Sequence, residues 1–597
     1  MVFSRIFHAT TTEIRTVFGR GHGHYPRRQR TEMKNLACAT KMEAKKMLDQ
    51  FDPILFWSKA SLEAQRQDYT FGDGTGIDEA KKGRTKLEPK VGGPTRASRA
   101  LAIVHIAMYD ALLMADPASF HNSHNRFARL AAYQPMLPAA PAVISREAAV
   151  AGAASVTIRL LFEDAIVEQL VTEYRLHLYE MGQSAQAIET GLEYGAAIGR
   201  MLADARSVDG SGPRDRQYRA FGLPGTFSPD PYSPLGTTVL GATWGFDVTP
   251  FATYPDGTIG FVGPSEALGE QPPQPGQTEP LGSFLEAMNW PADRDLVAGK
   301  GAAPGTGRLT RTAEETLIGT FWAYDGVRGI GLPPRLYNQC LHAIAEQANF
   351  STEALAVLLA ICNLGMADAG IAAWREKFTY HVARPATLLR TNEAGFREDT
   401  ASVPTFDQAR LTMPPGGAGK PDYTSIKTWL ELLPDTPSLV DSDAHWAPLG
   451  APQTNSVPRG GDGPKSRTPQ FPAYPSGHAT FGSTCFGLAS ELLEALGHGK
   501  DIVFAFVSDE YDGRAIDPDG SVRPRHARQM TLAQAIHENA VSRLYLGVHW
   551  QIDAVEGVRL GRNLIDVMKS NPVGPLHAIV PDGSFGPGLA AKAKEMM

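Results

Sequence analysis

The stretch FPAYPSGHATFG, residues 471–482, places Ser476, Gly477 and His478 directly before a helical pattern. Gly477 has no Cβ, so backbone at this point can come close to a ligand. The helix predicted from Ala479 to Leu496 would present unpaired N–H groups at its first turn. Such a turn could cradle a tetrahedral oxyanion. Taken alone, the pattern is more simply an N-cap with a structural histidine.

A second stretch, WREKFTYHVARP, contributes basic side chains. Lys377 and Arg384 are seven residues apart, and this spacing predicts nearly the same face of one helix. Pro385 disfavours helical geometry at the residue before it, so Arg384 is expected at a helix end. An isolated pair of this kind would usually be a solvated basic face.

The third stretch, SRLYLGVHWQID, combines an arginine with a histidine and an aspartate. Gly547 predicts that one helical piece ends near Arg543 and that the next begins near His549, so both side chains could point into one site. Asp553 lies one helical turn beyond His549, where its carboxylate could accept the imidazole N–H. Viewed alone, these residues are more simply a surface arginine and a buried, hydrogen-bonded histidine.

Taken together, the three stretches offer hydrogen-bond donors in excess. They supply one lysine, two arginines, a serine hydroxyl, backbone N–H groups and two histidines. This set suits an anion that only accepts hydrogen bonds and carries several charges, such as phosphate or vanadate. A neutral histidine nitrogen could then attack phosphorus or bind vanadium directly.

The motifs K-x6-R-P, P-S-G-H and S-R-x5-H-x3-D occur here in the order typical of one superfamily. In all three parts the chain resembles the superfamily of vanadium-dependent haloperoxidases and type 2 phosphatidic acid phosphatases. The segments PAYPSGHATFG, LGVHW, FWAYDG with PPRLYNQ, and ILFW with RALAIVHIAMYDA resemble the chloroperoxidase branch. The resemblance covers most of residues 50–570 and is weakest in the Gly/Pro-rich middle.

The resemblance implies a role for each motif residue. His549 would be the axial metal ligand, and His478 would be the acid–base group. The residues implied to hydrogen-bond the vanadate oxygens are Lys377, Arg384, Ser476, Gly477, His478 and Arg543. Lys377 would also be catalytic, by drawing charge from bound peroxide. Asp325, in FWAYDG, would pair with Arg543, and Trp374 and Phe471 would wall the halide site.

The implied activity is a vanadate-dependent haloperoxidase that oxidises chloride, bromide or iodide with hydrogen peroxide to hypohalous acid and so halogenates a small organic acceptor. Vanadium(V) acts as a Lewis acid, so neither haem nor flavin is expected. Bromide-preferring algal relatives tend to carry a histidine in place of Phe471, so the phenylalanine favours chloride. A homodimer is compatible with the sequence.

Two other functions remain open from the residues. A soluble acid phosphatase would use His549 as the nucleophile of a phospho-histidine intermediate and His478 to protonate the leaving group. The three motifs do not separate it from a haloperoxidase, although Trp374 and Phe471 suit a desolvated halide pocket better. A helical scaffold with a decayed site is the third alternative, and the completeness of all three motifs argues against it.

Helical periodicity predicts the elements that position these residues. It marks the ranges 94–117, 140–162, 165–205, 312–389, 479–496 and 531–568, and strand-type alternation is scarce. Gly and Pro are dense over 209–280, with disorder expected around 272–280, and 414–472 is a second irregular stretch.

The predicted fold is therefore all-α, with two four-helix bundles and a loop-rich Gly/Pro middle region. The predicted divisions are an N-terminal extension (1–48), a first bundle (49–208), an irregular connection (209–311), a second bundle carrying the vanadate site (312–570) and a C-terminal tail (571–597).

Composition is that of a soluble globular protein: of 597 residues, 43% are hydrophobic and 20% are charged. A net charge of -7 gives no general attraction for nucleic acid or anionic membrane. The apolar segment 354–374 is interrupted by Asn363 and Asp368, which favours a core helix over a membrane span. The 4 cysteines form no CxxC pair and are expected as buried thiols.

The N-terminal residues 1–48 differ from the rest, with ten Lys or Arg against three Glu. They lack a secretory hydrophobic region. An organelle-targeting sequence, a disordered basic arm, and extra residues upstream of a later start at Met33 or Met42 are equally compatible with this segment, so no cellular location is assigned.

Overall fold

The computed structural model describes fifteen separate ranges of the chain. The described residues are 52–70, 90–117, 138–162, 167–212, 218, 226–229, 239–252, 290–303, 309–327, 329–389, 446–452, 454–455, 468–500, 502–517 and 521–570. The predicted N-terminal extension and C-terminal tail, the expected disorder around 272–280, and Cys38 lie outside these ranges.

The described helices from the first half of the chain are α4 (Pro53–Thr70), α5 (Pro94–Ala115), α7 (Arg146–Leu161), α8 (Val167–Glu180), α9 (Ala185–Ala205), the short α10 (Trp244–Asp247) and α13 (Trp290–Lys300). Of these, α5, α7, α8 and α9 lie within the predicted helical ranges, whereas α4, α10 and α13 do not. Helix α7 begins later than residue 140 because Ser145 caps it, accepting a hydrogen bond from Ala148 N at 3.0 Å.

The helical range predicted over 165–205 contains two helices, α8 and α9. The chain turns between α8 and α9, where Gly182 has φ +85° and Ser184 caps the next helix by accepting from Ala187 N. Helix α13, which lies in the predicted irregular connection, was not expected. Its apolar positions are too few to give a strong helical period.

The described elements of the second half are also mainly helical. They are α14 (Ala313–Phe321), α15 (Pro333–Gln347), α16 (Thr352–Tyr380), α17 (Pro385–Leu388), α20 (Gly477–Ala495), η4 (Asp509–Tyr511), α21 (Leu532–Tyr545) and α22 (Gln551–Ser570), with strands β1 (Val503–Phe506) and β2 (Arg528–Thr531). The two strands form an antiparallel pair in which Phe504 lies opposite Met530.

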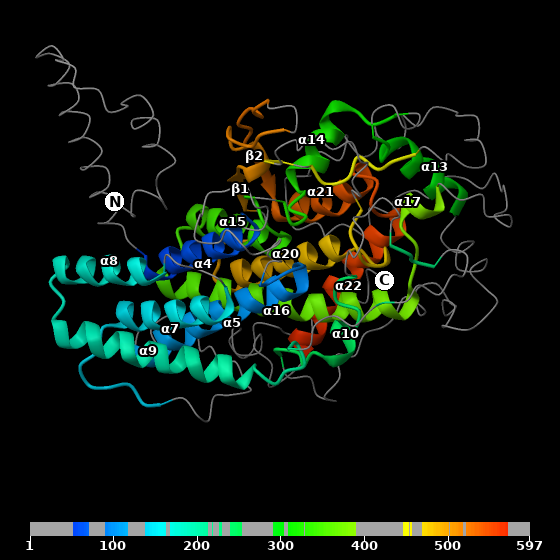
Figure 1. Ribbon diagram of the computed structural model, residues 1–597. Coiled ribbons are helices and arrows are strands. Elements are labelled where there is room, and N and C mark those ends of the chain that lie inside the picture. Colours follow the sequence, from blue (N-terminus) through cyan, green and yellow to red (C-terminus); the bar gives the residue numbers. More distant parts are fainter. Residues whose placement is uncertain are drawn as a thin grey trace, which may run out of the picture.

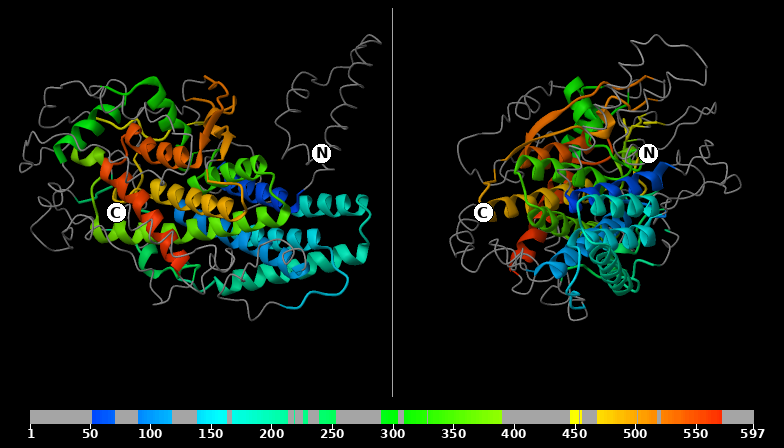
Figure 2. Two further views of the ribbon diagram at one scale, coloured as in Figure 1. Left: turned by 180° about the vertical axis from the view of Figure 1, so that it is seen from behind. Right: turned by 90° about the vertical axis from the view of Figure 1, so that its left-hand side faces the viewer.

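Helix α16 joins the two groups of helices. It packs against α5 on one side and against α20 on the other. Figures 1 and 2 show the blue and cyan helices gathered at one end of the molecule and the orange and red helices toward the other. One cluster of buried apolar side chains runs from Ile54 in α4 to Met568 in α22, so the two groups share a hydrophobic core.

Close packing of the first group depends on small residues. Helices α7 and α9 approach each other so closely that a Cβ at Gly195 would overlap the backbone of Ala149. Two helices, α5 and α16, are long and apolar enough to cross a membrane, but 89% and 100% of their most apolar windows are buried inside the structure. They serve here as core helices, as expected for 354–374.

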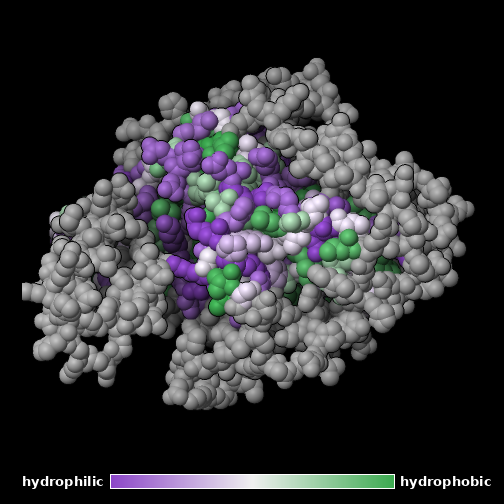
Figure 3. Space-filling view, turned by 90° about the horizontal axis from the view of Figure 1, so that it is seen from above, coloured by the Kyte–Doolittle hydropathy of each residue, from purple (hydrophilic) through white to green (hydrophobic). Residues whose placement is uncertain are grey.

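The all-α prediction is confirmed, and β1–β2 is a small addition to it. The domain boundaries stay a prediction, because the shared core does not mark them. Cys340, Cys362 and Cys485 are buried free thiols. On the face shown in Figure 3, hydrophilic side chains predominate and hydrophobic ones are interspersed, which is ordinary for an exposed surface.

Candidate functional site

The segment that carries Lys377 and Arg384 is arranged differently from the prediction. Helix α16 ends at Tyr380, His381 adopts the left-handed conformation with φ 55°, and Arg384 is the N-cap residue of α17. Lys377 and Arg384 therefore do not share one helix face. They nevertheless converge, because the turn at His381 redirects the chain, and Pro385 opens the next helix as expected.

Lys377 is fully buried at the end of α16. Its Nζ donates to the carbonyls of Pro472, Ala473 and Pro475 at 2.8, 2.8 and 2.5 Å, so all three of its protons have acceptors. Burial, followed by the nearby Arg384 cation, holds the pKa of Lys377 well below its usual range. An anion would share or replace one of these carbonyl contacts and would favour the ammonium form.

The Arg384 side chain lies next to His549. Its Nε donates to Phe471 O at 2.8 Å, and its NH1 donates to Val548 O at 2.7 Å and lies 3.0 Å from His549 Nε2. Burial lowers the pKa of Arg384 to about 9. A ligand bonded to His549 Nε2 would take the place of the NH1 contact.

His549 lies between Gly547, with φ +68°, and the start of α22. Its Nδ1 is 2.9 Å from Asp553 Oδ2, the hydrogen bond expected from the spacing. Burial, followed by the Arg384 and Lys377 cations, keeps the pKa of His549 well below its usual range, so the ring is neutral. With the proton on Nδ1, the lone pair of Nε2 faces the site.

Arg543, near the end of α21, forms the pair expected with Asp325. Its NH2 donates to Asp325 Oδ2 at 2.7 Å, and the arginine side chain is 1% exposed. Burial alone would raise the pKa of Asp325, but the Arg543 charge, followed by His478, outweighs it and lowers that pKa. The carboxylate is therefore ionised and holds one side of the guanidinium.

His478 lies in the first turn of α20, facing the same carboxylate. Its Nε2 is 3.4 Å from Asp325 Oδ1, and the ring also hydrogen-bonds the backbone at Trp322. Burial, followed by the Arg543 charge, lowers its pKa to about 3. The ring is neutral at physiological pH and could take a proton once an anion offsets the arginine.

The loop that carries Ser476 and Gly477 meets α22 through its backbone. Ser476 N donates to Asp553 O at 2.8 Å, and the Ser476 side chain accepts from Ala479 N at 3.4 Å as the N-cap of α20. A Cβ added at Gly477 would lie 3.0 Å from Trp374 Cζ3. Glycine therefore leaves the backbone of this turn open beside the indole.

Trp374 and Phe471 form an aromatic wall beside the cations. Their ring centroids are 4.7 Å apart, and Lys377 Nζ lies 5.6 Å from the indole centroid and 5.3 Å from the phenyl centroid. Trp374 Nε1 donates to Leu240 O at 3.0 Å. Gly241, with φ +79°, lies so close to Trp374 that a Cβ there would overlap the indole. The backbone at Gly241 therefore fixes the ring.

Several buried donors of the site have no partner among the described residues. They are Arg384 NH2 and Arg543 Nε and NH1; His478 Nε2, 3.4 Å from Asp325 Oδ1, also makes no hydrogen bond to the described residues. Buried polar groups without partners cost free energy, so their gathering at one point indicates a ligand that accepts hydrogen bonds. Lys377, Arg384 and Arg543 gather here with only two carboxyl groups, those of Asp325 and Asp553. The residues fit a vanadate or phosphate anion.

The structure places every residue predicted for the site around this one point. It adds two that the motifs did not indicate: Tyr337 and Asn539 donate to the backbone carbonyl of His478 at 3.1 and 2.7 Å. Asn539 lies one turn before Arg543 on the buried face of α21, so helical periodicity could have revealed it. Among the described residues, no group of three or more His, Cys, Asp or Glu side chains could hold a metal ion.

Comparisons with known proteins agree with this geometry. Residues 357–570 match the family model of the VCPO second helical-bundle domain, a range that contains every predicted site residue except Asp325. The chain is 26% identical over 558 residues to the vanadium chloroperoxidase of Curvularia inaequalis, covering 84% of this chain and 79% of that protein.

Two solved structures share the fold. A bacterial vanadium-dependent iodoperoxidase matches with a TM-score of 0.54 and 18% identity, covering 86% of this chain and 95% of its own. An apo-type bacterial vanadium-dependent chloroperoxidase matches with a TM-score of 0.50 and 13% identity, covering 82% and 95%. With the matched second-bundle domain, these comparisons show that the chain is similar to vanadium haloperoxidases.

Proposed function

We propose that this chain binds vanadate(V) and oxidises halide with hydrogen peroxide to hypohalous acid, which halogenates a small organic acceptor. The observation that supports it most is the group of idle, buried donors on Arg384 and Arg543 beside His549 Nε2, whose lone pair faces Arg384 NH1 at 3.0 Å. Vanadate would supply Lewis-acid activation of peroxide without a haem or flavin. The relatives with this fold include a chloroperoxidase and an iodoperoxidase.

Each side chain would have a defined task in this reaction. The carboxylate of Asp553 holds His549 in the tautomer whose Nε2 can bond to the metal. Arg384 and Arg543 would hold the oxyanion by charge-assisted hydrogen bonds, with donors from Ser476 and Gly477. His478 Nε2 would take a proton from incoming peroxide, and Lys377 would hold positive charge against the bound oxygen.

The aromatic wall supports a halide as the electron donor. A halide is weakly hydrated compared with a phosphate ester, and Trp374 and Phe471 offer it a water-poor surface beside the Lys377 ammonium. We propose that chloride is accepted together with bromide and iodide, because Phe471 keeps this wall apolar. Bromide and iodide are easier to oxidise and should react faster.

A paired assay on one preparation tests the function. Protein loaded with vanadate should halogenate a dye when peroxide and halide are supplied, whereas vanadate-free protein should hydrolyse phosphate esters far more slowly. Efficient ester hydrolysis without halogenation would favour the phosphatase with a phospho-histidine at His549. The chloride assignment is tested separately: bromination without any chlorination at mildly acidic pH would overturn it.

A further inference from the structure

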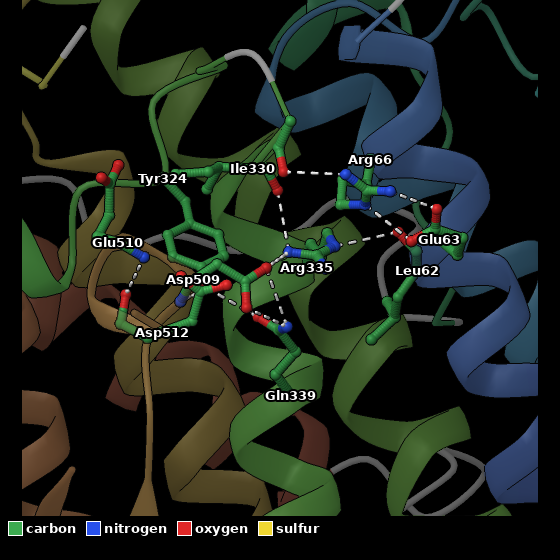
Figure 4. A network of polar contacts seen from close by, with 12 residues as sticks. Leu62, Glu63, Arg66, Tyr324, Ile330, Arg335, Gln339, Asp509, Glu510 and Asp512 are labelled. Atoms are coloured by element: carbon green, nitrogen blue, oxygen red, sulfur yellow. Dashed lines mark hydrogen bonds and ion pairs between the residues drawn. The ribbon is translucent and has the colours of Figure 1, made fainter. Parts of the chain in front are cut away.

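A second arginine–aspartate pair, with a buried arginine and a partly buried aspartate, lies close to the turn that carries Asp325, as Figure 4 shows. Arg335 of α15 pairs with Asp509 of η4. Arg335 also donates from NH1 to Ile330 O at 3.0 Å and from Nε to Leu62 O at 3.1 Å. The pair thus joins helix α4 of the first group to the far side of the turn.

The described residues of the turn, 322–327 and 329–331, belong to no helix or strand. Gly326 N donates to Gly331 O at 2.9 Å, and both glycines have positive φ values, +78° and +97°. Backbone of this kind keeps a fixed place only through contacts with its neighbours. The place of Asp325 therefore depends on the residues that grip the turn.

Tyr324, the residue before Asp325, anchors the turn through hydrogen bonds. The tyrosine is fully buried; its hydroxyl accepts from Asp509 N at 2.7 Å and donates to Gln339 Oε1 at 3.0 Å. Gln339 Nε2 in turn donates to Asp509 Oδ1 at 3.2 Å. The polar network thus holds Tyr324, and the adjacent Asp325 holds Arg543 NH2 at 2.7 Å.

We propose that Tyr324, Asp509 and Arg335 are positioning residues that fix Asp325 and, through it, the idle donors of Arg543 for oxyanion binding. The proposal rests on the proposed function, which assigns Arg543 to the anion. The three residues act through Asp325. If the turn shifts, the Arg543 guanidinium keeps its charge, but its Nε and NH1 no longer point toward the anion. Oxyanion affinity then falls while the protein stays folded.

Binding of oxyanion to the metal-free protein tests the proposal. Titration calorimetry would give the dissociation constants of vanadate and of inorganic phosphate for wild type, Tyr324→Phe and Asp509→Asn, with melting temperatures measured in parallel. Tyr324→Phe removes one hydroxyl and keeps the ring, and we expect both anions to bind about tenfold more weakly. Asp509→Glu keeps the carboxylate and should recover most of the affinity lost in Asp509→Asn.

Asp209→Asn is the matched control, because Asp209 pairs with Arg99 among the first-half elements at 2.8 Å. It should lower the melting temperature and leave both dissociation constants unchanged. Wild-type affinity in Tyr324→Phe and Asp509→Asn would overturn the inference alone, as would an equal loss in Asp209→Asn. A wild-type protein that binds neither anion would instead overturn the proposed function, and the inference with it.

Discussion

Two buried arginines of the molecule each pair with an aspartate, but they use their remaining donors differently. Arg335, 6% exposed, also donates to the carbonyls of Ile330 and Leu62. Arg543, 1% exposed, bonds Asp325 through NH2, and its Nε and NH1 have no partner among the described residues. A satisfied guanidinium stabilises the fold, whereas idle donors cost free energy until a ligand arrives.

Substitution of His549 should have the largest effect on the oxyanion site. His549→Ala removes the nitrogen that faces the idle donors, and we expect loss of vanadate retention and of turnover, with the melting temperature little changed. Dialysis followed by metal analysis measures retention. A variant that retains vanadate and brominates a dye at the wild-type rate would contradict the ligand role of His549.

Substituting each arginine by glutamine tests the comparison directly. Arg543→Gln should weaken oxyanion binding by about tenfold to a hundredfold, because a charged hydrogen bond contributes about 1.5–3 kcal/mol. Arg335→Gln should lower the free energy of unfolding by about 2 kcal/mol, since it leaves Asp509 without its cationic partner and with only the hydrogen bond from Gln339 among the described residues.

Calorimetry and urea denaturation of both variants measure the two effects. Arg335→Gln should also weaken binding through the turn, but its larger effect should be on stability. If Arg335→Gln costs more affinity than Arg543→Gln does, the distinction between satisfied and idle donors is wrong.

A smaller effect is expected at Gly477. An added Cβ would lie 3.0 Å from Trp374 Cζ3, and the indole is held by its bond to Leu240 O, so the turn must shift slightly. We expect Gly477→Ala to weaken oxyanion binding about threefold. Gly212→Ala is the control, because a Cβ there meets nothing within 4 Å. Equal affinities in both variants would show that the turn tolerates the methyl group.

The smallest effect on binding is expected at Glu376, the residue before Lys377 in α16, whose side chain is buried. Burial raises its pKa to about 7. Because the folded protein then holds this proton more tightly than the unfolded chain, its stabilising contribution is full below about pH 4.5 and is lost as pH rises through 7. Glu376→Gln should remove this loss, which amounts to about 3 kcal/mol at most above pH 8.

Urea denaturation of wild type and Glu376→Gln between pH 4 and pH 8 measures the difference. The two curves should diverge as the pH rises, with oxyanion affinity unchanged. Parallel curves would show that the buried carboxyl does not titrate in this range.

Much of the site could be predicted from local spacing. Gly547 ends one helix and places Arg543 and His549 on either side of a turn, and the four-residue step to Asp553 gives the imidazole its acceptor. These relations depend only on helix geometry. The all-α class follows from the same periodicity.

Features that depend on tertiary contacts could not be predicted. Helix α16 ends at Tyr380 because His381 adopts a left-handed conformation, which nothing in the sequence HVARP specifies. The strands β1 and β2 are four residues each, too short for alternation to stand out. The backbone at Gly241 that fixes the Trp374 ring lies more than ninety residues from that ring in the chain. The carbonyl partners of Lys377 are also more than ninety residues from the lysine.

The hydrogen bond from Ser476 N to Asp553 O has a practical consequence. It ties the serine loop to helix α22 by main chain alone, so exchanging side chains should not change the spacing between the two halves of the cradle. The walls at Trp374 and Phe471 could therefore be redesigned for other electron donors while the anion stays where it is. Libraries of variants at these two positions would be screened for new oxidation chemistry. Unchanged vanadate affinity would show that the oxyanion site is intact.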